Sequence, residues 1–269
     1  MKTKKDLKGR LAVVTGASSG IGLCFCRTLA ARGCDLVMVS NQERELNDFA
    51  DALAREFGVR AVPLFQDLTV QFAADAVMAF LDRESLEPDY LINNAGIFSF
   101  RPVTDTGEGK VNAFVDLHVR AVTTLSRAFA IRFARRGSGR ILNMSSMSCW
   151  MPMPGIALYS ATKAYIRVFS RALHYEMLDS GVTVTVACPG GIATDLFGLP
   201  ENLKKLALNL HAIQSPEKFT ERAVGKMLKG KKQYINGWLN RVAIVAVALT
   251  PTSLRRMIKH RLLDRGIVR

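Results

Sequence analysis

The sequence predicts an α/β fold in which short buried strands alternate with helices. Residues Leu11–Val14 are rich in β-branched side chains, as a short buried strand is. A glycine-rich turn follows, and LCFCRTLAARG at 23–33 has the pattern of a helix that ends at Gly33. This order places backbone N–H groups at a helix N-terminus, where they can bind a pyrophosphate.

The turn itself contains Gly16, Gly20 and Gly22 within TGASSGIG. Their spacing is GxxxGxG and differs from the common dinucleotide fingerprint GxGxxG. An ordinary strand-to-helix turn that needs flexible residues is the alternative interpretation.

The second expected strand, Asp35–Val39, ends where a dinucleotide fold normally contacts the adenosine ribose. The helix after it has apolar residues at helical spacing: Leu46, Phe49, Ala50, Leu53, Ala54 and Phe57. An acid at the strand end would bind the 2′-hydroxyl of NAD, and a base would bind the 2′-phosphate of NADP. Here Ser40 and Asn41 are neutral, and Arg44 lies near. We therefore expect NADP(H) in preference to NAD(H).

Two further strands are expected at Ala61–Phe65 and Tyr90–Ile92. Asp67, after the first of these, either meets the adenine amino group or caps a helix together with Thr69. NNAG at 93–96 follows the second, and it lets the backbone pass close to a ligand or makes a plain turn.

A serine, a tyrosine and a lysine carry the predicted chemistry. Tyr159 and Lys163 are four residues apart in YSATK, and Ser146 precedes the tyrosine by thirteen. Residues at i and i+4 share one helix face, so the ammonium charge is expected to lower the phenol pKa from its usual ~10. With the serine holding an oxygen atom nearby, the three groups can exchange a proton with a ketone or an alcohol.

TGASSGIG, NNAG and the Ser–Tyr–Lys set, in this order, resemble the short-chain dehydrogenase/reductase family over about residues 8–194, and the extended C-terminus resembles that of its steroid and long-chain acyl subgroup. The resemblance implies one doubly wound Rossmann domain, a seven-stranded parallel sheet with helices on both faces. It implies cofactor contacts at Gly16, Ser18, Ser19, Gly20, Ile21, Gly22, Ser40, Asn41, Asp67, Leu68, Asn94, Ala95, Gly96, Tyr159, Lys163, Pro189, Gly190, Ile192 and Thr194. It also implies that Tyr159 is the acid/base, that Lys163 binds the nicotinamide ribose, and that Ser146 holds the substrate oxygen.

One position departs from the family. Relatives have an asparagine where HVRAVTTLSRA places His118, and that asparagine holds a water that relays protons from the lysine. An imidazole both donates and accepts, so His118 can serve as the relay. The alternative is a histidine that satisfies the backbone of a kinked helix.

Metal and disulfide chemistry are not expected. The four histidines do not cluster with cysteines, and no HExxH or paired CxxC is present. The odd count of five cysteines indicates free thiols in a reducing compartment: Cys24, Cys26, Cys34, Cys149 and Cys188. No secretory h-region follows the basic start MKTKKDLKGR, so a cytoplasmic location is expected.

The positive charge is concentrated in the last quarter of the chain. Residues 201–269 contain 15 Lys and Arg and 4 Asp and Glu, so this segment has a net charge of +11. The net charge of the whole chain is +14. Helices are expected at 201–213 and 215–230, the latter with an N-cap serine followed by proline, and a last strand at 231–237. The main domain then spans 1–237, with substrate-capping helices at about 195–228.

Residues 238–269 form a basic, partly apolar extension. The run Val242–Leu249 is too short to span a bilayer, and Leu254, Met257, Ile258, Arg261 and Leu262 suggest a basic amphipathic helix. Such a helix can lie on an anionic membrane surface or pack on the domain or a neighbouring subunit. Nucleic acid is not expected, because no aromatic residues interleave a basic face.

The favoured function is NAD(P)(H)-dependent interconversion of a secondary alcohol and a ketone. Apolar residues expected to border the pocket favour a hydrophobic steroid or fatty-acyl type substrate: Cys149, Trp150, Met151, Met153, Leu196, Phe197 and Leu199. The family resemblance implies a homodimer or homotetramer. The alternative is a catalytically weak dinucleotide-binding module that acts through its basic tail at a membrane or a partner.

Overall fold

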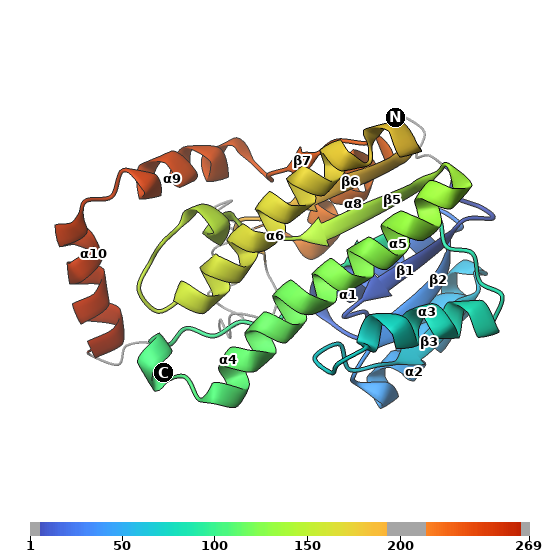
Figure 1. Ribbon diagram of the computed structural model, residues 1–269, viewed down its shortest axis with the longest axis horizontal. Helices are drawn as coiled ribbons and strands as arrows, with labels where there is room; N and C mark the ends of the chain where they lie inside the picture. Colours follow the sequence, from blue (N-terminus) through green and yellow to red (C-terminus); the bar gives the residue numbers. More distant parts are fainter. Residues whose placement is uncertain (1–5, 193–213, 265–269) are drawn as a thin grey trace.

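The computed structural model describes residues 6–192 and 214–264 and shows seven parallel strands in one sheet (Figure 1). The strand order is β3-β2-β1-β4-β5-β6-β7, so the sheet is wound outward in both directions from β1 and β4. The strands are β1 Leu11–Thr15, β2 Asp35–Ser40, β3 Ala61–Phe65, β4 Tyr90–Asn93, β5 Gly139–Met144, β6 Val182–Ala187 and β7 Gln233–Tyr234. The predicted doubly wound α/β fold is confirmed.

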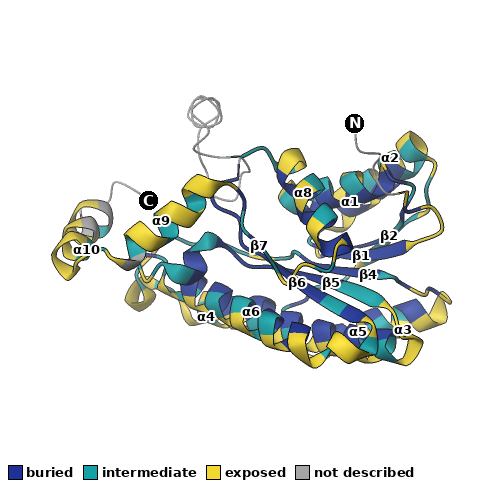
Figure 2. Cartoon of the chain, turned by 90° about the horizontal axis from the view of Figure 1, so that it is seen from above, coloured by how far each residue is buried: buried dark blue, intermediate teal, exposed yellow. Residues whose placement is uncertain are grey.

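Helices cover both faces of the sheet (Figure 2). One core joins the sheet to α1 Gly20–Ala30, α2 Glu43–Phe57 and α8 Pro216–Leu228. The other joins it to α3 Ala73–Arg83, α5 Val122–Arg136 and α6 Ala157–Glu176. Within β1, Ala12 and Val14 enter the first core, whereas Leu11 and Val13 enter the second. A strand buried on both sides has to be apolar at every position, which explains the continuous run in the sequence.

Two element boundaries differ from the sequence predictions. Helix α1 begins at Gly20 and not at Leu23, because the glycine-rich turn supplies its first residues. The last strand contains only Gln233 and Tyr234, because the side chain of Asn236 accepts a hydrogen bond from the N–H of Gly190 at 2.7 Å and the chain then turns away. The N-terminus of α8 is as predicted, since the hydroxyl of Ser215 accepts a hydrogen bond from the N–H of Lys218.

A long helical segment contains a π-helical turn. Helix α4, Glu108–Val115, continues through the π-helix η2, Asp116–Ala121, into α5. His118 lies in this turn, and π-helical turns are frequent at functional sites because they redirect side chains.

A buried polar network fixes the helices that carry the functional groups. The amide of Asn93 at the end of β4 donates to Asn143 of β5 at 2.9 Å and to Ser126 of α5 at 3.1 Å. Asn143 in turn donates to Ser170 of α6 at 2.9 Å. Buried polar groups that satisfy one another specify a single arrangement, so α5 and α6 are held in register with the sheet.

The C-terminal segment leaves the sheet after β7 as α9, Trp238–Ala248, α10, Thr252–Lys259, and a π-helical turn η6, His260–Asp264 (Figure 1). The residues of the predicted basic amphipathic helix therefore lie in α10 and η6, while the domain boundary at 237 stays a prediction. None of the helices in the described ranges has the length and apolarity needed to cross a membrane. The predicted helix at 201–213, and with it Leu196, Phe197 and Leu199, lies outside the described residues.

Gly22 offers a test of the turn geometry. A Cβ at this position would lie 1.9 Å from the carbonyl oxygen of Gly16, so no side chain fits without moving the turn. We expect Gly22→Ala to lower the free energy of unfolding by about 1–3 kcal/mol and to weaken dinucleotide binding. Gly109→Ala is the matched control, because nothing lies within 4 Å of a Cβ there. Thermal unfolding and nicotinamide fluorescence measure both effects, and two variants of equal stability would contradict the assignment.

Candidate active site

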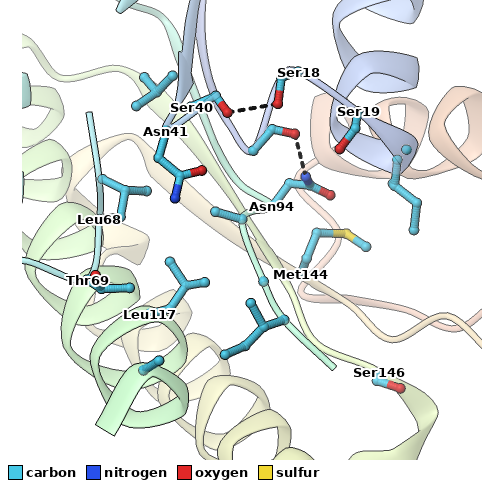
Figure 3. Close-up of a pocket in the computed structure, with 18 of the residues that line it drawn as sticks. Ser18, Ser19, Ser40, Asn41, Leu68, Thr69, Asn94, Leu117, Met144 and Ser146 are labelled. Atoms are coloured by element: carbon cyan, nitrogen blue, oxygen red, sulfur yellow. Dashed lines mark hydrogen bonds between the residues drawn. The ribbon is translucent and has the colours of Figure 1, made fainter. Parts of the chain in front are cut away.

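A cavity of about 520 Å³ opens at the carboxyl ends of the central strands (Figure 3). Its walls come from the turns after β1, β2, β3 and β4, from the end of β5, from α6 and from the loop after β6. The predicted residues that line it are Gly16, Ser18, Ser19, Gly20, Ile21, Ser40, Asn41, Asp67, Leu68, Asn94, Ala95, Gly96, Ser146, Tyr159, Lys163, Pro189, Gly190 and Ile192. Ligands of open α/β sheets bind in this position, where the strand order reverses.

The glycine-rich turn is held against the loop after β4. The hydroxyl of Thr15 accepts hydrogen bonds from the N–H groups of Asn94 and Ala95, each at 3.0 Å. The Asn94 amide donates to the carbonyl of Thr15 at 3.1 Å, so this side chain also has a structural role. Gly22 is not part of the cavity wall; it lets α1 pack directly on the turn.

The first turn of α1 fits an anionic ligand. The N-cap residue Ser19 makes no side-chain capping bond, and the first turn contains no acidic residue. Ser18 to Ile21 all line the cavity at this helix end. Backbone N–H groups and the helix dipole favour a phosphate group there, so the residues present fit the pyrophosphate of a dinucleotide.

Neutral hydroxyl and amide groups line the end of β2. The hydroxyls of Ser18 and Ser40 lie 2.8 Å apart (Figure 3). Ser18 also donates to the Gln42 amide oxygen at 2.6 Å. Asn41 lines the same wall, and Arg44 does not. Gln42 was not predicted as a site residue, because it is neither acidic nor basic and its position depends on the turn of the backbone.

Asp67 lines the cavity, but its carboxylate already has local partners. One oxygen accepts from the N–H and from the hydroxyl of Thr69, both at 2.8 Å. This is an Asx-type turn within the loop, not a helix N-cap, because α3 begins only at Ala73. The helix-cap alternative is therefore wrong, and contact with adenine stays a prediction.

Tyr159 and Lys163 project from one face of α6 into the cavity, as the i, i+4 spacing predicts. The ammonium nitrogen of Lys163 lies 5.6 Å from the centre of the Tyr159 ring and donates to the carbonyl of Met144 at 3.1 Å. Ser146 lines the same wall after β5 and hydrogen-bonds the phenol. The three predicted groups therefore share one wall of the cavity.

The expected effect of Lys163 on the phenol is wrong in this structure. Burial raises the pKa of Tyr159 to about 12, and the hydrogen bond from Ser146 is the influence that opposes it. Phe98 packs edge-on against the tyrosine ring, with ring centres 5.0 Å apart, and this contact contributes to the burial. The phenol is therefore held in its protonated form at neutral pH.

Lys163 is itself altered by its surroundings. Burial lowers the pKa of this amine to about 8, because few groups replace the water that would solvate the ammonium ion. Close to neutral pH the group retains its proton, and it loses that proton as the pH rises past 8.

His118 is fully buried and both of its ring nitrogens have partners. Nε2 accepts from the N–H of Ile97 at 3.0 Å, and Nδ1 lies 2.9 Å from the hydroxyl of Thr162. That hydroxyl donates to the carbonyl of Tyr159 at 3.0 Å, so it accepts from His118 Nδ1–H. Burial, with a smaller contribution from Lys163, lowers the histidine pKa well below 6.5, and the ring is neutral.

These contacts assign His118 a different immediate partner from the one the sequence suggested. Its ring satisfies the loop after β4 and not the kinked helix that carries it. The proton-relay role stays a prediction, and it requires one ring nitrogen to exchange its present partner for water.

Other expectations concern groups outside this wall. Thr194 lies outside the described residues. All five cysteines are free thiols, four of them buried. In residues 6–192 and 214–264, no three His, Cys, Asp or Glu side chains gather as a metal site requires.

Known proteins resemble this chain in sequence and in structure. A family profile described as short chain dehydrogenase matches residues 10–202. Very-long-chain 3-oxoacyl-CoA reductase of Anas platyrhynchos is 30% identical over 86% of this chain and 72% of its own length. The inactive hydroxysteroid dehydrogenase-like protein 1 of Homo sapiens is 31% identical over 81% of this chain and 66% of its own length. The chain thus spans about two thirds of the length of these curated relatives.

Among solved structures, the short-chain dehydrogenase from Sphingobium yanoikuyae in complex with NADPH superposes with a TM-score of 0.77. The two sequences are 27% identical, and the match covers 97% of this chain and 96% of that one. The likeness therefore extends over the whole fold.

The contacts of His118 predict its tautomer. Because the N–H of Ile97 points at Nε2, we expect the proton on Nδ1 and no titration of this ring near pH 6.5. Nitrogen-15 NMR of the imidazoles distinguishes the four histidines by comparison with a His118→Asn variant. A His118 resonance that titrates near 6.5 would contradict the arrangement.

Proposed function

Since the chain belongs to the short chain dehydrogenase family, we propose that it is an NAD(P)(H)-dependent oxidoreductase that interconverts a secondary alcohol and a ketone. The observation that carries the proposal is the position of Tyr159, Lys163 and Ser146. They share one wall of a cavity whose other end is the glycine-rich N-terminus of α1. A proton-transferring group and a dinucleotide site therefore face the same space.

The bound nicotinamide would supply or accept the hydride. The protein's residues bind the substrate oxygen and transfer its proton. Ser146 donates a hydrogen bond that holds the substrate oxygen, and Tyr159 exchanges a proton with it. The raised pKa of Tyr159 keeps the phenol protonated, and a protonated phenol is the form that donates to a carbonyl oxygen. At neutral pH the phenol is therefore in the form that ketone reduction requires.

NADP(H) is the proposed cofactor, in preference to NAD(H). No carboxylate lines the cavity at the end of β2, where Ser18, Ser40, Asn41 and Gln42 lie. An acidic residue there would repel a 2′-phosphate, whereas hydroxyl and amide groups can donate hydrogen bonds to it. The structural relative that holds NADPH supports this choice.

A hydrophobic substrate of steroid or fatty-acyl type is proposed. Ile97 lines the cavity, and Phe98 covers one side of the Tyr159 ring. Trp150 and Met151, which were predicted to border the pocket, follow Ser146 along the chain and are partly exposed, but neither lines the cavity. The names of the duck and human relatives refer to acyl and steroid chemistry and support the same class.

The alternative is a dinucleotide-binding module with little turnover, and the relative named as inactive gives it weight. For either function we also propose a homodimer or homotetramer, and a peripheral contact of residues 238–269 with a membrane or another partner.

A spectrophotometric screen tests the proposed activity. Steroid ketones and 3-oxoacyl thioesters are offered with NADPH and with NADH, and nicotinamide absorbance is followed at 340 nm. We expect turnover with NADPH, its loss by at least about a thousandfold in Tyr159→Phe, and retention within tenfold in His118→Asn. Both variants should still bind NADPH.

Two outcomes would contradict the proposal. A fully active Tyr159→Phe protein would remove the phenol from the mechanism. Nicotinamide binding without turnover across the whole panel would favour the binding module.

The pH dependence of reduction tests the role of Lys163. Below pH 8 the amine is protonated, and above pH 8 it is neutral, whereas the phenol stays protonated until about pH 12. If the ammonium ion is required, kcat/KM for reduction falls tenfold per pH unit above about 8. His118 is neutral throughout, so His118→Asn should leave this limb in place. If kcat/KM begins to fall only above pH 10, the pH dependence arises from a group other than Lys163.

A further inference from the structure

We propose that α9 docks on an anionic membrane surface through an apolar stripe on its outer face. The inference rests on the proposed membrane contact of residues 238–269, gives it a surface and a lipid class, and does not depend on turnover. The stripe consists of Trp238, Val242, Val245 and Leu249, and we call it the α9 stripe.

The α9 stripe is a continuous apolar line on one side of the helix. Its residues are spaced by four, three and four positions, which places them on one helical face. They are between 56% and 77% exposed, although each is large and apolar. Single exposed apolar residues are common, but four in one line mark an interaction site.

The opposite side of α9 is already occupied by the domain. Asn240 packs so closely on Gly190 that a Cβ there would lie 2.4 Å from its side-chain atoms. The Asn240 amide also donates to the carbonyl of Asn236 at 2.6 Å. Ile244 and Val247 lie on this inner side and are partly buried. One face of α9 therefore packs on the domain, and the α9 stripe lies on the opposite, exposed face.

The positive charge of the C-terminal segment indicates that the membrane surface bound by α9 is anionic. Residues 238–269 contain seven Lys and Arg and one Asp. In α10 and the turn after it, Arg256, Lys259 and Arg261 are exposed, and the apolar residues Leu254 and Met257 are exposed beside them. Apolar residues flanked by basic ones, with a tryptophan at one end, fit the boundary between anionic headgroups and acyl chains.

A second copy of this chain fits the same surface less well. In a two-fold contact the same patch faces itself, so two segments with a net charge of +6 would be brought together. An anionic bilayer instead complements that charge. A helix of eleven residues cannot cross a bilayer, and it can lie along one with its outer face inserted.

Docking would bring lipid close to the cavity. Asn236 accepts from the N–H of Gly190 at 2.7 Å, and Gly190 lines the cavity on the side of the helix that faces inward. A helix with its side chains is about 10 Å across, so acyl chains and cavity wall would be separated by about that distance. An apolar substrate then has a short path from the bilayer.

The test is co-sedimentation of the full chain with vesicles at low salt. Vesicles of 70% phosphatidylcholine and 30% phosphatidylserine are compared with pure phosphatidylcholine. We expect binding to the anionic vesicles at least tenfold tighter than to the neutral ones, and weaker binding as salt increases.

Two variants and a matched control distinguish the contribution of the apolar stripe from that of the positive charge. Val245→Glu should weaken binding to anionic vesicles at least tenfold, whereas Leu178→Glu, which adds the same charge at an exposed apolar position before β6, should change it less than twofold. Arg256→Ala should weaken binding to anionic vesicles about fivefold and leave the neutral ones unchanged. NADPH binding should be unaltered in all three.

Three results would overturn the inference. The full chain ignores anionic vesicles at low salt; Val245→Glu binds them as well as Leu178→Glu does; or light scattering shows that Val245→Glu alone dissociates an oligomer while the unaltered chain does not bind vesicles. The last result would assign the stripe to a second copy. None of these outcomes bears on ketone reduction, which the nicotinamide assay reports separately.

Discussion

The ammonium group of Lys163 is buried where α6 passes the end of β5, and the rest of the site is arranged around it. An ammonium ion without water is costly unless it has hydrogen-bond acceptors. Here the Met144 carbonyl accepts a hydrogen bond from the ammonium group. The hydroxyl of Ser145 also donates to the backbone carbonyl of Lys163 at 2.7 Å, which fixes the position of this residue. A side chain at position 96 would crowd this region, because a Cβ there would lie 3.0 Å from His118 Nε2 and 3.4 Å from the lysine nitrogen. The buried ammonium group of Lys163 therefore restricts which residues fit at positions far from it in the sequence.

Burial moves all three titratable groups of the site toward their neutral forms. It raises the pKa of Tyr159, and it lowers the pKa of Lys163 and of His118. The consequences differ because the starting values differ. The phenol and the amine both remain protonated at neutral pH, whereas the imidazole is fixed without its second proton. The site thus holds one acidic proton on the phenol and one positive charge on the lysine, with the histidine as a neutral hydrogen-bonding link between the loop after β4 and α6.

Local patterns in the sequence predicted the strands, the glycine-rich turn and the shared face of Tyr159 and Lys163, because each depends on neighbours a few residues away. The fate of His118 depends on Thr162, which is 44 residues distant, and on the π-helical turn that directs the ring inward. No periodicity in the sequence reports either feature. The direction of the Tyr159 pKa was also mispredicted, since helical spacing gives proximity to a charge and says nothing about loss of water.

Helix α9 packs against a residue that also forms part of one wall of the candidate active site. Gly190 lines the cavity, its N–H is held by Asn236, and its missing side chain makes room for Asn240 of α9. The Asn240 amide donates to the carbonyl of Asn236 at 2.6 Å, so hydrogen bonds join the loop after β6 to the start of α9. The position of the C-terminal helix and the shape of the cavity are consequently coupled through two asparagines. Substitutions at Asn236 or Asn240 should therefore affect cofactor binding, although neither side chain lines the cavity.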